Sequence, residues 1–173
     1  GEATPIYMYW NEAIARIHRY NPKIKLIIVL RNPIDRAFSH WNMERDKGRE
    51  KRPFFQAIID EESKINSSDR IQDKTFSYLD RGRYSSQIKN IYKYFQDSQL
   101  LVLRNDLLRK NPDEVLMRIS KYLNISPFQS INYKEVNTRS YPVSMEEKEL
   151  SFLKSFYKKE LDSLEELLEW DLA

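Results

Sequence analysis

The chain has 173 residues, 40% hydrophobic and 13% aromatic, which is enough to build one globular domain over residues 1–173. Its 29 Lys and Arg nearly balance 26 Asp and Glu, and a net charge of +3 argues against a nucleic-acid-binding protein. The absence of cysteine excludes disulfides and thiolate-bound metal, and no apolar run reaches the ~18 residues of a membrane span. We therefore expect a cytoplasmic protein without a membrane span.

The first part of the chain predicts a helix, a strand and a second helix. Apolar residues recur at helical spacing across residues 11–20, and Asn21-Pro22 ends this helix. The aliphatic run Ile24–Leu30 is typical of a strand buried on both faces of a parallel sheet. Asn32 and Pro33 supply an N-cap and a first helical position. The apolar stripe of this second helix is Ile34, Ala37, Phe38 and Trp41.

The middle of the chain alternates charged segments with amphipathic ones. Residues 44–52 read as a charged, solvated run, and a third helix begins at Pro53. Residues 66–74 indicate an exposed polar loop. A fourth amphipathic helix begins at Tyr84, and a second buried strand follows at Gln99–Leu103.

The last part of the chain is predicted to be helical around one long loop. A helix begins at Pro112, and a loop covers residues 124–142. Two closing helices are then expected. Their apolar residues are Leu150, Leu153 and Tyr157, followed by Leu161, Leu164 and Leu168. This order of elements predicts an α/β fold with three layers, a parallel sheet flanked by helices. Two clear strands are few for such a sheet, so we expect the domain to be incomplete at its N-terminal side.

The segment Arg31–Trp41, with the sequence RNPIDRAFSHW, carries the strongest chemical signal. Arg31 ends a buried strand, at the edge where open α/β sheets bind ligands, and the next helix directs its N-terminus to the same place. Ser39 lies two turns along that helix and offers a hydroxyl. A guanidinium and a hydroxyl suit a phosphate monoester. From the residues alone, an Arg31–carboxylate pair with Ser39 as a packing residue is an equal alternative.

This segment resembles the 3′-phosphate-binding segment of sulfotransferases that use 3′-phosphoadenosine 5′-phosphosulfate (PAPS). The resemblance covers nearly the whole chain and includes the heparan-type and bacterial members. It implies a P-loop-like sulfotransferase fold, in which Arg31 and Ser39 bind the 3′-phosphate of the donor. It further implies that a sulfuryl group moves to a hydroxyl or amine, leaving adenosine 3′,5′-bisphosphate, with no metal required.

Two further segments match this family in the same order along the chain. GEATPIY, residues 1–7, is similar to the heparan-type segment whose glutamate is the proposed base, which implies that Glu2 is catalytic. Ala3 replaces a lysine common in that branch, and a frayed terminal carboxylate is the alternative reading of Glu2. RGRY, residues 81–84, resembles the Gly-x-Tyr start of the helix that flanks the nucleotide. Tyr84 would then touch the adenosine, or serve as a core residue of its helix.

A third segment near the C-terminal end, NTRSYP, resembles the loop that closes over the 3′-phosphate. It assigns donor binding to five consecutive residues. They are Asn137, Thr138, Arg139, Ser140 and Tyr141. Asn137 and Thr138 replace the lysine and glycine of the family pattern, and an ordinary polar loop is the alternative.

The family also carries a lysine-bearing loop that grips the 5′-phosphosulfate, and no such pattern occurs among these residues. We therefore expect the chain as given to be inactive without that loop. A module that binds a 3′-phosphorylated adenosine nucleotide without turnover is the alternative function. Carbohydrate, small-molecule and carrier-tethered acceptors all remain open.

Overall fold

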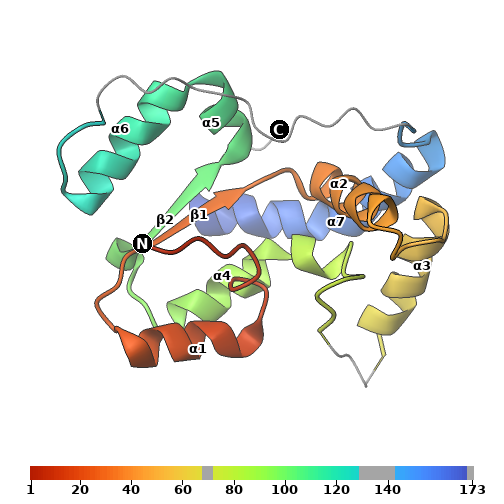
Figure 1. Ribbon diagram of the computed structural model, residues 1–173, viewed down its shortest axis with the longest axis horizontal. Helices are drawn as coiled ribbons and strands as arrows, with labels where there is room; N and C mark the ends of the chain where they lie inside the picture. The colour runs from red at the N-terminus through yellow and green to blue at the C-terminus, as the bar shows by residue number, and fades with distance from the viewer. Residues whose placement is uncertain (68–71, 129–142, 171–173) are drawn as a thin grey trace.

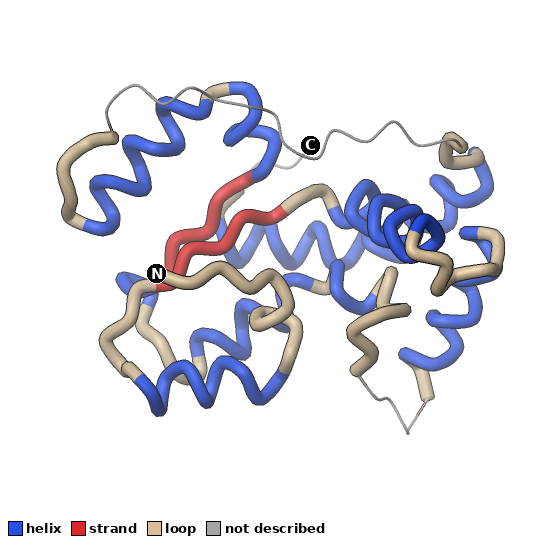
Figure 2. The backbone as a smooth tube through the Cα atoms, viewed as in Figure 1, coloured by secondary structure: helices blue, strands red, loops and turns tan. Residues whose placement is uncertain are grey.

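The computed structural model describes residues 1–67, 72–128 and 143–170, and most of them are helical (Figures 1 and 2). The elements are, in chain order, α1 (Asn11–Tyr20), β1 (Leu26–Leu30), α2 (Pro33–Asp46), α3 (Phe54–Ile65), the 3-10 turn η1 (Asp80–Gly82), α4 (Tyr84–Tyr92), the 3-10 turn η2 (Asp97–Gln99), β2 (Leu100–Arg104), α5 (Asn105–Lys110), α6 (Pro112–Leu123) and α7 (Glu147–Leu168).

The two strands pair in parallel, as the sequence predicted. Leu26 lies opposite Leu100, and Leu30 lies opposite Arg104. In Figure 1, α1 and α4 lie on one side of the pair, and α5 and α6 lie on the other. The predicted α/β fold, with helices on both sides of a parallel sheet, is therefore confirmed.

One face of the sheet is covered by the first of two core clusters. Side chains on this face pack against α1, α4 and the C-terminal part of α7. The buried members of this cluster are Ile14, Leu30, Tyr84, Ile88, Ile91, Phe95, Leu100, Val102 and Leu164. This packing fixes the carboxyl end of β1 next to the start of α4.

The opposite face of β1 differs from the expectation that this strand is buried on both faces. Ile27 and Val29 point to that face and remain 38% and 43% exposed. Within the described ranges no element covers them fully, although α6 packs against β2 and its Tyr122 donates to the Leu26 carbonyl of β1 at 3.1 Å. The expectation of a doubly buried strand is wrong for β1 in this structure.

The second cluster joins α2, α3 and the N-terminal part of α7. The predicted stripe of α2 is entirely buried here. Its buried members are Ile34, Ala37, Phe38, Trp41, Phe54, Ala57, Ile58, Tyr78, Leu79, Leu153 and Tyr157. Because α7 contributes to both clusters, it ties the two halves of the described chain together (Figure 1).

The two closing helices of the prediction are one continuous helix, α7, with 22 residues. The apolar positions from Leu150 to Leu168 recur every three or four residues without interruption, so they form a single stripe. No glycine or proline occurs within α7 to end it. The prediction of a break was wrong because nothing in the local sequence requires one.

The charged run at residues 44–52 is also less solvated than predicted. The side chains of Glu44 and Glu50 are only 2% and 4% exposed. Glu44 is paired with Arg49, and Glu50 accepts hydrogen bonds from Arg52 and from the Tyr78 hydroxyl at 2.9 Å. Burial of these charges is possible because each carboxylate has hydrogen-bonded partners.

Candidate active site

Arg31 lies at the carboxyl edge of the parallel pair, where the sequence predicted it. It directly follows Leu30, the last residue of β1, and its side chain is half-buried. Asn32 then caps α2, since its side-chain oxygen accepts the backbone N–H groups of Ile34 at 2.9 Å and Asp35 at 3.4 Å. Strand end, arginine and helix N-terminus therefore meet at one place.

The cap changes one detail of the predicted phosphate site. The first-turn amides of α2 were expected to face an anion, but those of Ile34 and Asp35 are bonded to Asn32, and Pro33 has no N–H. An anion at this edge would therefore depend on side-chain donors and on the helix dipole rather than on these amides.

Ser39 lies on the less buried side of α2. It is half-buried and shares this side with Asp35, one turn earlier, which is exposed. Its neighbours Phe38 and His40 are buried. The hydroxyl is thus outside the core-facing stripe of the helix, as a ligand-binding role requires.

Tyr84 begins α4 and belongs to the core cluster that also contains Leu30. Burial raises the pKa of its phenol, and the positive charges of Arg36, Arg31 and Arg81 oppose that rise. The three guanidinium groups are therefore close enough to Tyr84 to act on it electrostatically. Tyr84 is a core residue in this structure, and its predicted contact with adenosine stays a prediction.

We call Arg31, Arg36 and Arg81 the arginine cluster. In the described ranges no carboxylate lies within ion-pair distance of any of them. Arg36 donates to the Tyr78 carbonyl, but its Nε atom is buried without a hydrogen-bond partner among the described residues. Burial, and next the charge of Arg36, lower the pKa of Arg81. Glu61 lies close enough to Arg36, and Glu44 close enough to Arg81, to oppose part of this positive charge, but no described carboxylate forms an ion pair with the cluster. The remaining positive charge suits an anionic ligand.

The sequence analysis assigned no role to Arg36 or Arg81. Arg36 is the second arginine of the segment that carries Arg31, and Arg81 directly precedes the glycine of the Gly-x-Tyr pattern. Both positions therefore lay inside segments that the analysis had singled out. What was missing was the packing of η1 against α2, which brings the two segments together.

Glu2 makes its hydrogen bonds within its own segment. Its carboxylate accepts hydrogen bonds from the hydroxyls of Tyr7 at 2.7 Å and Thr4 at 3.0 Å. These bonds, the one from Tyr7 first, lower its pKa, so the group is ionised at neutral pH. The role of Glu2 as base stays a prediction.

The other predicted donor-binding segment, residues 137–141, lies outside the described residues. Of the predicted site residues that are described, Arg31 follows β1, Ser39 lies on α2 and Tyr84 begins α4, and the charge of Arg31 acts on the pKa of Tyr84.

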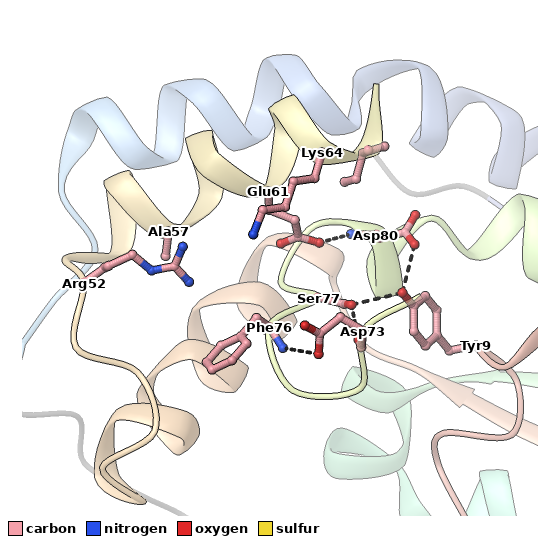
Figure 3. Close-up of a pocket in the computed structure, with 10 residues that line it drawn as sticks. Tyr9, Arg52, Ala57, Glu61, Lys64, Asp73, Phe76, Ser77 and Asp80 are labelled. Carbon is pink, nitrogen blue, oxygen red and sulfur yellow. Dashed lines mark hydrogen bonds between the residues drawn. The ribbon is translucent and has the colours of Figure 1, made fainter. Parts of the chain in front are cut away.

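Two hollows lie beside this edge rather than at it. A cavity of about 50 Å³ lies between α3, the loop before η1 and Tyr9 (Figure 3). One of its walls is Glu61, which accepts three consecutive backbone N–H groups at 2.6, 2.7 and 2.9 Å. Burial nevertheless raises the pKa of Glu61 to about 7.

The second hollow is a wider surface groove of about 750 Å³ that shares Lys64 and Asp73 with the cavity. Its walls are Ile6, Trp10, Lys64, Ser67, Gln72, Asp73, Lys74 and Thr75. Neither hollow includes Arg31, Ser39 or Tyr84.

The described residues contain no group of three or more His, Cys, Asp or Glu side chains that could hold a metal ion. None of the described helices is both long and apolar enough to cross a membrane.

Comparison with known proteins identifies relatives of this chain. It is 32% identical over 115 residues to the human bifunctional heparan sulfate N-deacetylase/N-sulfotransferase 2, a match that covers 65% of this chain and 12% of that protein. It is 29% identical over 124 residues to the mouse heparan sulfate glucosamine 3-O-sulfotransferase 3B1, covering 72% of this chain and 30% of that protein. The chain thus spans less than a third of the length of these two relatives.

A solved structure has the same fold. The crystal structure of a sulfotransferase from Alicyclobacillus acidocaldarius superposes with a TM-score of 0.81 at 26% sequence identity, covering 99% of this chain and 65% of that one. The family model for the sulfotransferase domain matches residues 14–163, which include both strands and the arginine cluster. The chain belongs to the sulfotransferase domain family.

Proposed function

We propose that the complete protein transfers a sulfuryl group from PAPS to a hydroxyl or amine of a carbohydrate. One observation carries this proposal beyond family membership. Arg31, the strand-end arginine, lies at the ligand-binding edge of a parallel sheet beside a capped helix N-terminus, with no carboxylate partner among the described residues. A guanidinium in this position, outside any described ion pair, is suited to a phosphate dianion.

Donor binding would involve residues from three separate segments. Arg31 and the Ser39 hydroxyl would hold the 3′-phosphate, and Tyr84 would lie against the nucleoside. Residues 137–141 would close over the same phosphate, as the family resemblance implies. Arg36 and Arg81 would add positive potential without direct contact being required, because they lie close to Tyr84.

The reaction requires one base and no redox partner. The acceptor oxygen or nitrogen forms a bond to sulfur while the bond from sulfur to the 5′-phosphate oxygen breaks, and the acceptor proton passes to a carboxylate. Glu2 would accept this proton, and adenosine 3′,5′-bisphosphate would leave. Because Tyr7 and Thr4 lower the Glu2 pKa, the carboxylate is in the ionised form that a base must have.

The groove near residues 64–75 supports a carbohydrate acceptor. Trp10 provides an apolar aromatic wall, and Lys64 and Lys74 provide positive charge. Aromatic faces bind sugar rings, and lysines bind the sulfate or carboxylate groups of acidic oligosaccharides. The relatives named above act on heparan sulfate according to their names, which agrees with this choice of acceptor.

The test combines nucleotide binding with sulfate transfer in the complete protein. Calorimetry with adenosine 3′,5′-bisphosphate should show binding that Arg31→Ala weakens about ten- to a hundredfold, since a charged hydrogen bond contributes about 1.5–3 kcal/mol. Arg19→Ala, an exposed arginine of α1, is the matched control and should bind like the wild type. An unchanged dissociation constant for Arg31→Ala would falsify the phosphate assignment.

Transfer from labelled PAPS to a panel of oligosaccharide acceptors tests the chemistry. Glu2→Gln should keep nucleotide affinity while turnover falls by about 10²–10⁴, because the amide cannot accept the proton. The exposed Glu147→Gln serves as its control. Full turnover by Glu2→Gln would assign the base elsewhere. Nucleotide binding without transfer to any acceptor would favour the non-catalytic binding module instead.

A further inference from the structure

Residues 2–10, which carry the proposed base, form a compact unit held by its own hydrogen bonds. Glu2 accepts the Tyr7 hydroxyl at 2.7 Å, and the Tyr7 amide donates to the Thr4 carbonyl at 3.1 Å. The Trp10 amide donates to the Ile6 carbonyl at 3.0 Å. These bonds span residues 2–7 and 6–10, so they overlap at residues 6 and 7 and restrict the segment along its length. We call residues 2–10 the base segment.

Tyr9 attaches the base segment to the body of the protein. Its side chain is 4% exposed, and its hydroxyl donates to Asp80 Oδ2 at 3.0 Å. The same hydroxyl lies 3.0 Å from Ser77 Oγ (Figure 3). Both partners are themselves buried. Burial raises the pKa of Tyr9 to about 12, so the phenol keeps the proton that it donates to Asp80.

Two further contacts support the same attachment. The Gln72 side chain donates to the Tyr9 carbonyl and accepts the Asn11 backbone N–H at 3.1 Å. The Arg81 guanidinium lies 5.6 Å from the centre of the Tyr9 ring, within the range of a cation–π interaction. The base segment is thus attached mainly to residues 72–81.

Residues 72–81 continue directly into the segment proposed to bind the nucleotide of the donor. Asp80 begins η1, its backbone N–H donates to Glu61 at 2.9 Å, and Tyr84 starts α4 just beyond η1. Arg81 lies in the same turn and belongs to the arginine cluster. The Tyr9–Asp80 hydrogen bond therefore connects the segment of the proposed base to the segment of the proposed nucleotide site.

We propose that Tyr9 is a positioning residue for sulfuryl transfer, and this rests on the proposed function. Tyr9 touches neither donor nor acceptor. Its hydroxyl sets the base segment at a fixed place relative to η1 and α4. In-line transfer is sensitive to such placement, because a displacement of about 1 Å can lower the rate about a hundredfold. Loss of the hydroxyl should therefore slow turnover without weakening donor binding.

The experiment compares Tyr9→Phe with Tyr122→Phe in the complete protein. Both variants keep the ring and lose phenol hydrogen bonds: Tyr9→Phe loses those with Asp80 and Ser77, and Tyr122→Phe loses the one to the Leu26 carbonyl. Among the described residues, the Tyr122 hydroxyl bonds to β1 and not to the base segment. We expect Tyr9→Phe to lower kcat about tenfold or more, with the dissociation constant of adenosine 3′,5′-bisphosphate within about twofold of wild type. Tyr122→Phe should leave both quantities near their wild-type values.

A double-mutant cycle with Asp80→Ala separates positioning from general destabilisation. If Tyr9 and Asp80 act through one hydrogen bond, the double variant should turn over no more slowly than the slower single variant. Independent, multiplicative losses would overturn the proposal, as would equal losses in Tyr9→Phe and Tyr122→Phe.

The outcomes also separate this inference from the function on which it rests. A wild-type protein that transfers no sulfate would overturn the proposed function and this role with it. Active wild type together with a Tyr9→Phe variant of wild-type kcat would overturn only the role of Tyr9.

Discussion

Replacement of Gly82 by alanine should destabilise the protein through one defined collision. A methyl group at Gly82 would lie 2.4 Å from the Tyr157 hydroxyl oxygen and 2.8 and 2.9 Å from the ring atoms Cζ and Cε1. Tyr157 is fully buried, and its hydroxyl donates to the Leu79 carbonyl at 2.7 Å. The glycine of the Gly-x-Tyr segment is therefore required by the close approach of η1 to α7.

The expected magnitude follows from three contributions. Forced overpacking of a core costs about 1–3 kcal/mol. A shift of Tyr157 that breaks its hydrogen bond to Leu79 costs about 1 kcal/mol more. Alanine also lowers the conformational entropy of the unfolded chain, which stabilises the folded state by about 0.4–1 kcal/mol and offsets part of the loss. The free energy of unfolding should therefore fall by about 1–3 kcal/mol in Gly82→Ala.

Urea denaturation of the complete protein, followed by circular dichroism, measures this change. The double variant Gly82→Ala/Tyr157→Phe tests the cause, because it removes the oxygen responsible for the 2.4 Å contact. Its loss should be smaller than the sum of the two single losses. Unfolding free energy of Gly82→Ala within about 0.5 kcal/mol of wild type, or strict additivity in the double variant, would refute the steric argument.

Two further predictions concern the helix cap and acid stability. Asn32→Ala should lower the free energy of unfolding, measured with denaturant, by about 0.5–2 kcal/mol, because the Ile34 and Asp35 amides lose their acceptor. Asn32→Asp should restore this stability but weaken binding of the bisphosphate. Equal binding by Asn32→Asp and wild type would contradict a phosphate next to the cap. Burial raises the pKa of Glu50, but the hydrogen bonds from Arg52 and Tyr78 outweigh this effect and lower the pKa to about 2. A lowered carboxyl pKa stabilises the folded state at pH values above 4.5, the ordinary pKa, and this stabilisation is lost as the pH falls towards 2. Glu50→Gln should therefore unfold with a lower free energy than wild type at pH 6, and the difference should narrow below pH 4.5. A difference that stays constant with pH would contradict this reasoning.

Several local features could be predicted from the sequence because short-range chemistry decides them. An aliphatic run followed by Arg31, Asn32 and Pro33 predicted a strand, its end and a capped helix, and all three are present. The side-chain cap is a bond between neighbours in the sequence, so no distant partner was needed. The position of Arg31 at the carboxyl edge of the parallel pair followed, because parallel strands place their carboxyl ends together.

Other local predictions failed where the pattern admitted two outcomes. The uninterrupted stripe of α7 fits one helix or two, and the charged run at residues 44–52 fits a solvated loop or a set of buried ion pairs. Glu50 bonds first to its neighbour Arg52, but its burial also depends on the Tyr78 hydroxyl, which lies 28 residues away in the sequence. The aliphatic run that contains Ile27 and Val29 is also typical of a strand buried on both faces. Only the position of α6 in the structure shows that the face of these two residues stays partly exposed.

The sequence by itself determined the family, the two strands and the arginine at the end of β1, since each follows from residues close together in the chain. Only the tertiary structure decided that Arg36 and Arg81 join Arg31 around Tyr84, and that Tyr9 attaches the base segment to Asp80. These groups belong to segments separated by up to 71 residues, and packing of η1 against α2 and α7 brings them together. No periodicity or motif records such a contact, because it depends on how buried surfaces fit and on which buried polar groups find partners.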